Sequence, residues 1–237
     1  MLKIQLTDKI GDIVAACPTT AEVFKKYNID FCCGGDRPLV SALREQHLDQ
    51  EEVVSALEAA CAAAARSREK YVDWRQAPLN DLIDHIVATH HGYLRRVLPE
   101  LSVLTTRILQ VHGDGHEELF TVHRLFHTLK TELEQHRTKE ELRLFPLIEE
   151  YEKDPTPEKL AKIRELIAEL EAEHDAAGGL LKELRAVTDD YAVPADACLS
   201  YRLTYEKLQE LESDLFQHIH LENNVLHPRL REAAVGN

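Results

Sequence analysis

Apolar residues recur at steps of three and four along most of this chain, which is the period of an amphipathic α-helix. Good helix formers dominate, and no stretch alternates between polar and apolar residues cleanly enough to indicate a strand. The pattern predicts an all-α protein with long helices near residues 80–111, 116–152, 157–187 and 195–226. Helices of this length joined by short loops favour an antiparallel four-helix bundle.

A smaller helical unit precedes the predicted bundle. Its apolar segments predict helices near residues 8–15, 19–27, 37–46 and 49–66. We therefore divide the chain into a small helical domain and a bundle, residues 1–70 and 71–237, with a linker near 67–78. The sequence also suggests helix caps at Thr19 or Thr20, Asn80 and Thr156, a first helical turn at Pro157, and turns at Asn28 and Gly34–Gly35.

Composition narrows the expected partners and compartment. The 237 residues carry a formal net charge of −14, which argues against nucleic acid and anionic membrane surfaces as main partners. The sequence lacks the run of about 18 apolar residues that a membrane span needs, and its N-terminus lacks the apolar block of a signal peptide. Five cysteines, two of them adjacent, fit a reducing compartment better than a disulfide framework. We expect a cytoplasmic protein.

Each predicted bundle helix carries a histidine within its apolar stripe, and two helices add a glutamate four residues later. That spacing places both side chains on one helix face, one turn apart. A buried ionised carboxylate is strongly unfavourable unless it is neutralised, paired or bound to metal. Four imidazoles and two carboxylates suit two metal ions of borderline softness, as a spacing variant of the carboxylate-rich di-iron bundles. The candidate ligands are His91, His136, Glu140, His174, His218 and Glu222.

The two His-x-x-x-Glu motifs belong to an internal repeat. In each copy four residues separate the glutamate from an aromatic ring followed by proline, Phe145–Pro146 in one and His227–Pro228 in the other. A bundle with approximate two-fold symmetry would place both motifs at the same height. A lone histidine on an apolar face is ordinarily a hydrogen-bonded core residue, and a single His-x-x-x-Glu pair can be a surface ion pair. Six such residues on four stripes favour a metal site.

Spacing leaves one ligand undecided. His90 lies on an alternative stripe with Ile86, Tyr93 and Val97, so the period allows either His90 or His91 to face the core. The remaining histidines are interpreted as surface, packing or metal-supporting residues: His47, His85, His112, His116, His123, His127, His220 and His227.

Two adjacent cysteines, Cys32 and Cys33, precede Gly34–Gly35. We expect the glycines to turn tightly and leave the thiols accessible, and a helix start near Pro38 with Arg37 nearby to favour the thiolate. Adjacent trans residues hold their Cα atoms ~3.8 Å apart, below the usual disulfide range. These cysteines are therefore candidates for redox exchange, iron transfer or an intermolecular bond, with two buried small hydrophobic residues as the alternative. Ordinary helix or loop roles are expected for Cys17, Cys61 and Cys198.

Five segments follow one another over nearly the whole chain: KYNIDFCCGG, APLNDLIDHIV with His91 downstream, EQHRTKEELRLFPLI, EAEHDAAGGLL and QHIHLENNVLHPRL. With these segments the chain resembles the repair-of-iron-centres (RIC) family of the YtfE/ScdA type. The resemblance implies a hemerythrin-like fold with two non-haem iron ions joined by an oxo or hydroxo bridge. It selects His91 over His90. It also implies one iron on His91 and His218, the other on His136 and His174, and bridging carboxylates at Glu140 and Glu222.

The resemblance also implies a function. The family repairs iron–sulfur clusters damaged by nitrosative or oxidative stress, which makes iron donation to damaged iron–sulfur proteins the leading hypothesis. Oxygen-carrying hemerythrins have five histidine ligands; four histidines here leave more open positions for nitric oxide or oxygen. The alternatives are therefore nitric oxide binding or reduction at the di-iron centre, which would make the protein an enzyme, and an oxygen or nitric oxide sensor or store. Accessible thiols on the small domain are compatible with a homodimer.

Overall fold

The computed structural model describes residues 3–66 and 72–233, and within these ranges it contains helices, turns and loops but no strand. The all-α prediction is confirmed. The chain forms two compact units. The first contains the described residues up to Leu82 together with Phe216–Ala233, and the second contains Ile83–Leu215. The predicted domain boundary near residue 70 lies outside the described residues and stays a prediction. No helix in the described ranges is both long enough and apolar enough to span a membrane.

The N-terminal part of the first unit contains three short helices and a longer one: α1 (Ile10–Ala16), α2 (Thr20–Lys26), α3 (Leu39–Glu45) and α4 (Gln50–Arg66). They correspond closely to the four predicted segments. Their apolar faces meet in one hydrophobic core, because side chains at helical spacing share a face. Its fully buried members include Ile10, Phe24, Leu39, Leu43, Val53 and Leu57.

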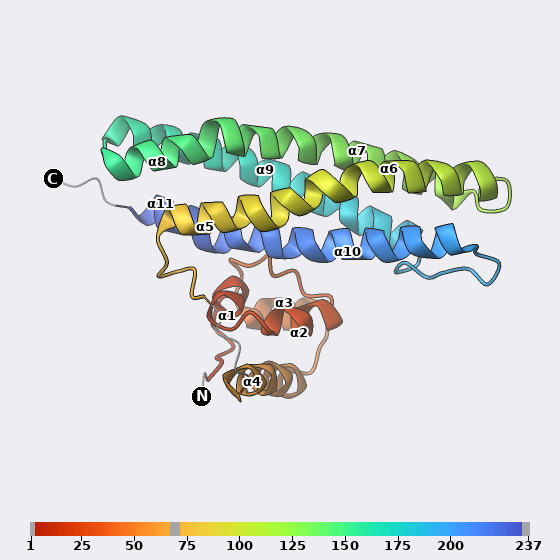
Figure 1. The fold of residues 1–237 in the computed structure, drawn as a ribbon. Coiled ribbons are helices and arrows are strands. Elements are labelled where there is room, and N and C mark those ends of the chain that lie inside the picture. Colours follow the sequence, from red (N-terminus) through yellow and green to blue (C-terminus); the bar gives the residue numbers. More distant parts are fainter. Residues whose placement is uncertain (1–2, 67–71, 234–237) are drawn as a thin grey trace. The chain divides into compact units, whose positions relative to one another are not determined.

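Four long helical stretches run in alternating directions, as predicted for an antiparallel bundle (Figure 1). In chain order they are α5 (Leu79–Ile86), η1 (Val87–His91) and α6 (Gly92–His112); α7 (Glu118–Lys139), η2 (Glu140–Leu144) and α8 (Phe145–Lys153); α9 (Pro157–Val187); and α10 (Leu199–Leu221), η3 (Glu222–Leu226) and α11 (His227–Glu232). In the second unit α7 packs against both α6 and α9.

Within the described ranges, π-helical turns interrupt three of the long stretches, at η1, η2 and η3. Proline follows two of them, with Pro146 in the first turn of α8 and Pro228 in the first turn of α11. Proline lacks an N–H group, and in a regular helix its ring clashes with the carbonyl four residues earlier. A wider π turn relieves this clash without ending the helix. The repeated Glu-x₄-aromatic-Pro sequence therefore encodes a local widening of the helix immediately after each glutamate.

The predicted helix caps are only partly correct. Thr19 makes no capping hydrogen bond, and the Thr20 hydroxyl donates to the Cys17 carbonyl at 2.7 Å instead. Asn80 lies inside α5, because the Pro78 carbonyl already accepts the first helical bond. Thr156 is confirmed as a cap, since its side chain accepts a hydrogen bond from the Lys159 backbone N–H.

The turn at Asn28 agrees with the prediction, whereas the start of the last long helix does not. Asn28 occupies a left-handed turn with φ 53°, as its position after α2 predicted. The last long helix begins at Leu199 rather than near residue 195, because the Ala197 N–H closes a turn on the Pro194 carbonyl. It also continues beyond residue 226, through η3 into α11.

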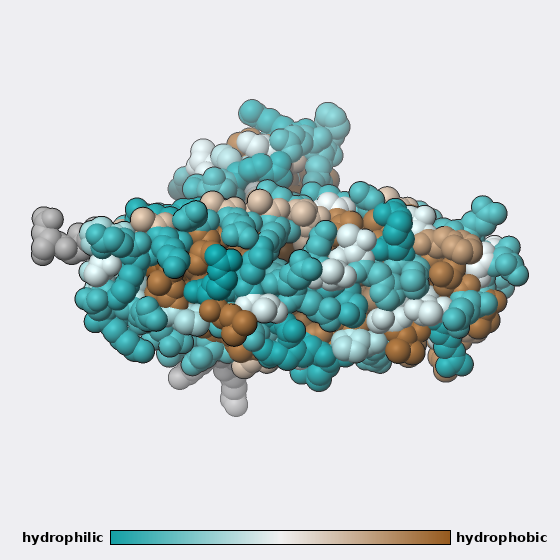
Figure 2. All heavy atoms as spheres, turned by 90° about the horizontal axis from the view of Figure 1, so that it is seen from above, coloured by the Kyte–Doolittle hydropathy of each residue, from teal (hydrophilic) through white to brown (hydrophobic). Residues whose placement is uncertain are grey.

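Figure 2 shows a face that is mostly hydrophilic, with hydrophobic side chains in small separate patches. Few large hydrophobic side chains are strongly exposed in the described ranges, and they are Val72, Val103, Val111, Phe120, Leu142 and Leu199. The apolar stripes of the helices are therefore largely turned inward, as their period predicted.

Candidate metal centre

Four predicted ligands lie in the second unit: His91 ends η1, His136 is in α7, Glu140 begins η2 and His174 is in α9. All four are buried, and His91 and Glu140 are 0% exposed. The Nε2 atoms of His136 and His174 are 3.0 Å apart. Glu140 Oε2 lies 3.2 Å from Nε2 of His91 and 3.4 Å from Nε2 of His136. Three imidazoles therefore direct a ring nitrogen toward the same small region.

The other two predicted ligands, His218 and Glu222, lie in the first unit. His218 is near the end of α10 and Glu222 begins η3, so their spacing places one above the other. The His218 Nε2 and Glu222 Oε1 atoms are 2.8 Å apart, and both side chains are buried. This pair has the same composition and spacing as His136 and Glu140.

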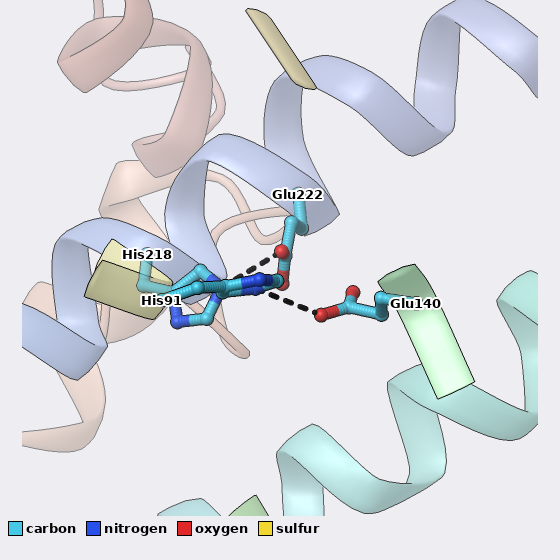
Figure 3. Close-up of side chains that lie close together, drawn as sticks. All are labelled: His91, Glu140, His218 and Glu222. Atoms are coloured by element: carbon cyan, nitrogen blue, oxygen red, sulfur yellow. Dashed lines mark hydrogen bonds and ion pairs between the residues drawn. The ribbon is translucent and has the colours of Figure 1, made fainter. Parts of the chain in front are cut away.

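The ligand atoms form two groups of four, and within each group they all lie within 4.8 Å of one another. Figure 3 shows the first group, in which two imidazoles face two carboxylates: His91, Glu140, His218 and Glu222. The second group contains His136, Glu140, His174 and Glu222. Both groups share the two glutamates, Glu140 and Glu222.

This donor set fits metal cations. Burying two carboxylates is costly without a compensating charge, and a cation held between them supplies that charge. Imidazole nitrogen combined with carboxylate oxygen suits divalent transition metals, including iron. The two shared carboxylates allow each group to offer two imidazoles and two carboxylate oxygens to one ion.

Sequence reasoning missed two carboxylates that orient the histidine rings. Glu141 Oε1 lies 2.8 Å from Nδ1 of His91, and Glu173 Oε2 lies 2.9 Å from Nδ1 of His136. Arg95 binds Glu141 and Lys139 binds Glu173, so each carboxylate is itself fixed. A carboxylate on Nδ1 keeps the proton there and leaves Nε2 as the metal-binding atom. The available signal was adjacency, because Glu141 directly follows one ligand and Glu173 directly precedes another.

Glu173 is ionised, as a carboxylate that accepts the Nδ1–H of His136 must be. Burial opposes ionisation of this side chain, but hydrogen bonds from Lys139 and His136 outweigh burial and lower the pKa of Glu173 below its ordinary value. The carboxylate is therefore ionised at neutral pH and accepts the Nδ1–H bond.

Replacing Glu173 by alanine is expected to weaken metal binding about 10- to 100-fold, the usual cost of removing an outer partner of a metal-bound histidine. Chelator competition on the metal-loaded protein measures the change. Glu169→Ala is the matched control, because Glu169 also binds Lys139. Equal affinities for the two variants would contradict the role of Glu173.

His90 takes no part in either group. Its Nδ1 lies 3.0 Å from Asp214 Oδ1, which gives this buried imidazole a carboxylate partner elsewhere in the bundle. His91, rather than His90, lies among the other candidate ligands, and the ligand assignment stays a prediction.

The structure agrees with only part of the prediction for the adjacent cysteines, Cys32 and Cys33. Cys32 is only 4% exposed, and no disulfide occurs among the described residues, which include all five cysteines. A hydrogen bond to Cys33, together with burial and the Asp30 carboxylate, raises the pKa of the Cys32 thiol. The expected accessible thiolate is therefore wrong for Cys32. Asp30, which sequence reasoning did not select, forms a third group of potential metal ligands with Cys32 and Cys33.

The cysteine segment is held by Asn224 of η3. The Asn224 side-chain amide donates to the Cys32 carbonyl at 2.9 Å. Gly35 is needed for close approach rather than for an unusual φ, because no described glycine has a positive φ. A Cβ atom at Gly35 would lie 2.6 Å from the Phe31 carbonyl oxygen and would also collide with the Asn224 side chain.

Gly35→Ala is therefore expected to destabilise the protein by about 1–3 kcal/mol, the usual cost of overpacking against a backbone that cannot easily move. Urea unfolding measures the change in free energy. Gly179→Ala is the control, because its Cβ would meet nothing within 4 Å and alanine favours a helix. A Gly35→Ala protein as stable as wild type would show that this segment can relax.

Comparison with known proteins gives two family matches. Residues 82–230 match the Hemerythrin HHE cation binding domain. Residues 6–61 match ScdA_N, a domain of unknown function. The first match contains all six candidate ligands and the second contains both adjacent cysteines.

Curated proteins named iron–sulfur cluster repair protein YtfE are similar over nearly the whole chain. The proteins from Shigella boydii serotype 4 (strain Sb227) and Enterobacter sp. (strain 638) are each 37% identical over 220 residues, which is 93% of this chain and 94% of theirs. The protein from Escherichia coli (strain K12 / DH10B) is 36% identical over the same shares. These matches confirm the resemblance that the five sequence segments predicted.

Proposed function

We propose that this chain, which belongs to the hemerythrin HHE cation-binding family together with the YtfE proteins, repairs iron–sulfur clusters damaged by nitrosative or oxidative stress. The observation that carries the proposal is the pair of buried ligand groups that share Glu140 and Glu222. The relatives are named as cluster repair proteins. The two family matches cover the cysteine segment and the six candidate ligands. The proposed mode of repair is donation of iron to the damaged cluster.

The proposed cofactor is two iron ions. His91 and His218 would hold one, His136 and His174 the other, and Glu140 and Glu222 would contact both. Bound iron would supply redox chemistry and an exchangeable ion. The chain itself contributes the buried ligands, and the carboxylates that contact Nδ1 of His91 and His136 orient these two rings. It also excludes water from the buried glutamate ligands, whose ionised form is unfavourable without a bound cation.

The Asp30, Cys32 and Cys33 group is the proposed transfer site. Two thiols and a carboxylate offer softer ligands than the buried centre. Metal binding would deprotonate the thiols despite the raised pKa of Cys32, because a cation favours the thiolate. Damaged iron–sulfur proteins are the proposed partners, and the cytoplasm is the proposed location. The net charge of −14 disfavours nucleic acid.

An iron-transfer experiment tests this proposal. The protein is loaded anaerobically with isotopically labelled iron and mixed with a hydro-lyase whose cluster has been damaged by nitric oxide. We expect activity and label to enter the hydro-lyase faster than with free ferrous iron at equal concentration. Cys33→Ser should slow the transfer without lowering iron content, and Cys198→Ser is the control thiol. Recovery no faster than with free iron would overturn iron donation.

Nitric oxide reduction is the second candidate, and the donor count favours it. Six protein ligands shared by two ions leave coordination positions open to a small molecule. With a chemical reductant supplied in excess, anaerobic nitric oxide should then yield nitrous oxide over several turnovers. Each turnover joins two nitric oxide molecules and takes up two electrons and two protons, releasing one nitrous oxide and one water. Stoichiometric uptake without product would leave a sensor or store as the alternative.

A further inference from the structure

Cys198 caps the start of α10, in the second unit and away from the candidate metal centre. Its carbonyl accepts the first helical hydrogen bond, from the Arg202 N–H at 3.1 Å, and its side chain is exposed. The helix continues from Leu199 to Leu221, so His218 lies about 30 Å further along by helical rise. Chemistry at Cys198 is therefore separate from that of the six candidate ligands.

An imidazole faces this thiol from another helix. His112, the last residue of α6, places Nε2 3.2 Å from the Cys198 Sγ. The His112 ring is packed edge-on against the rings of Tyr201 and His116, with centroids 5.5 and 6.2 Å away. A thiol and an imidazole at hydrogen-bonding distance, with the imidazole positioned by further groups, is the arrangement of an activated nucleophile.

The surroundings favour the thiolate. The hydrogen bond with His112, followed by hydrogen bonds from the backbone of Tyr201 and Ser200, lowers the pKa of Cys198 from its ordinary value of 9.0 to about 7. The backbone contribution reflects the N-terminus of α10, where unpaired N–H groups favour negative charge.

Two acidic side chains at this end of the bundle, Glu118 and Asp196, contact another histidine, His116. His116 Nδ1 lies 2.9 Å from Glu118 and its Nε2 lies 3.2 Å from Asp196. The Tyr201 hydroxyl donates to Glu118 at 3.3 Å. His112 is therefore the imidazole that contacts the thiol, while His116 offsets the two neighbouring carboxylates.

The other cysteines lack this combination. Cys17 and Cys32 are buried, and burial raises the pKa of the partly buried Cys61 to about 12. The pKa of Cys32 is raised as well. Among the five cysteines, all of which the structure describes, Cys198 alone combines an exposed side chain with a lowered pKa.

We propose that Cys198, activated by His112, is a site of thiol–disulfide exchange that forms mixed disulfides with low-molecular-weight disulfides. The Cys198 proton passes to His112 Nε2, and the thiolate attacks one sulfur of the disulfide. A new S–S bond forms as the old one breaks, and the departing thiolate takes the proton from His112. Cys198 and the small disulfide thus become a mixed disulfide and a free small thiol, with no further oxidant.

The test measures the rate of this exchange against pH in the metal-loaded full chain. The chromogenic disulfide 5,5′-dithiobis(2-nitrobenzoate) reports the rate, and peptide mass analysis after glutathione disulfide treatment identifies the modified residue. We expect Cys198 to be modified first, with a midpoint near pH 7. At pH 7 it should react about sixfold faster than an ordinary thiol, after allowing for the lower nucleophilicity of a low-pKa thiolate.

Two variants distinguish activation from exposure. Cys198→Ser should remove the fast phase. His112→Gln should slow it severalfold and move the midpoint toward 9.0, whereas His47→Asn, which removes an exposed imidazole elsewhere, should change neither. Modification of Cys33 before Cys198 in the wild-type chain would overturn the proposal. An unchanged midpoint in a folded His112→Gln variant would also overturn it.

Discussion

Replacing Glu222 by glutamine is expected to lower metal affinity by more than about 100-fold at both ligand groups, while the protein still folds. Loss of an outer partner alone costs 10- to 100-fold, and Glu222 is a proposed direct ligand of both ions. Glutamine keeps the volume and can still accept a hydrogen bond from His218. Only the charge and the second strong oxygen donor are removed.

Metal analysis after gel filtration, together with circular dichroism, tests this expectation. Glu206→Gln is the matched control, because it removes an exposed carboxylate from α10, in the same helical stretch as Glu222. The control should retain the wild-type metal content. If Glu222→Gln binds as much metal as wild type with equal affinity, Glu222 is not a shared ligand.

Removing the bound metal should lower the melting temperature more than any single substitution outside the centre. A ligand that binds only the folded state stabilises it by about 4 kcal/mol when its concentration is 1,000 times its dissociation constant. For a chain of this size that corresponds to roughly 8–16 °C per ion. The buried carboxylates make the effect large, because they lose their compensating charge when the metal leaves.

Calorimetry before and after anaerobic dialysis against a chelator measures this loss, and restoring the metal should reverse it. The Glu222→Gln protein should show almost no shift with the chelator. If the melting temperature of the wild-type protein is the same before and after chelation, a bound cation does not stabilise the folded bundle.

Helical period predicted most of the fold because it records which face of each helix is buried. The ligand stripes on α7, α9 and α10 followed from that period, including the one-turn spacing of His136 and Glu140. The choice between His90 and His91 could not follow from it. Both residues lie in a π turn, and a π turn shifts the register of all later side chains relative to a 3.6-residue period.

Interactions between distant parts of the chain account for the remaining differences. Cys32 was expected to be accessible because the two following glycines predict a tight turn that exposes the thiols. Its carbonyl is held by Asn224, which lies 192 residues away in the sequence. Cys198 and His112 are separated by 86 residues, so neither residue type nor spacing could pair them. The cap predicted at Asn80 was wrong because α5 begins at Leu79, one residue earlier than predicted. Helix ends are commonly uncertain by a residue or two.

The five residues of η3 have a thermodynamic consequence. This single turn contains Glu222, a candidate ligand, and Asn224, which holds the Cys32 carbonyl. If metal binding at Glu222 changes the free energy of binding at the cysteine segment, binding at the cysteine segment changes the free energy of metal binding by the same amount. If a metal ion bound by Asp30, Cys32 and Cys33 changes the metal affinity of the two histidine–glutamate groups by a given factor, metal in those groups must change the affinity of the cysteine group by the same factor. One measured coupling therefore fixes the other.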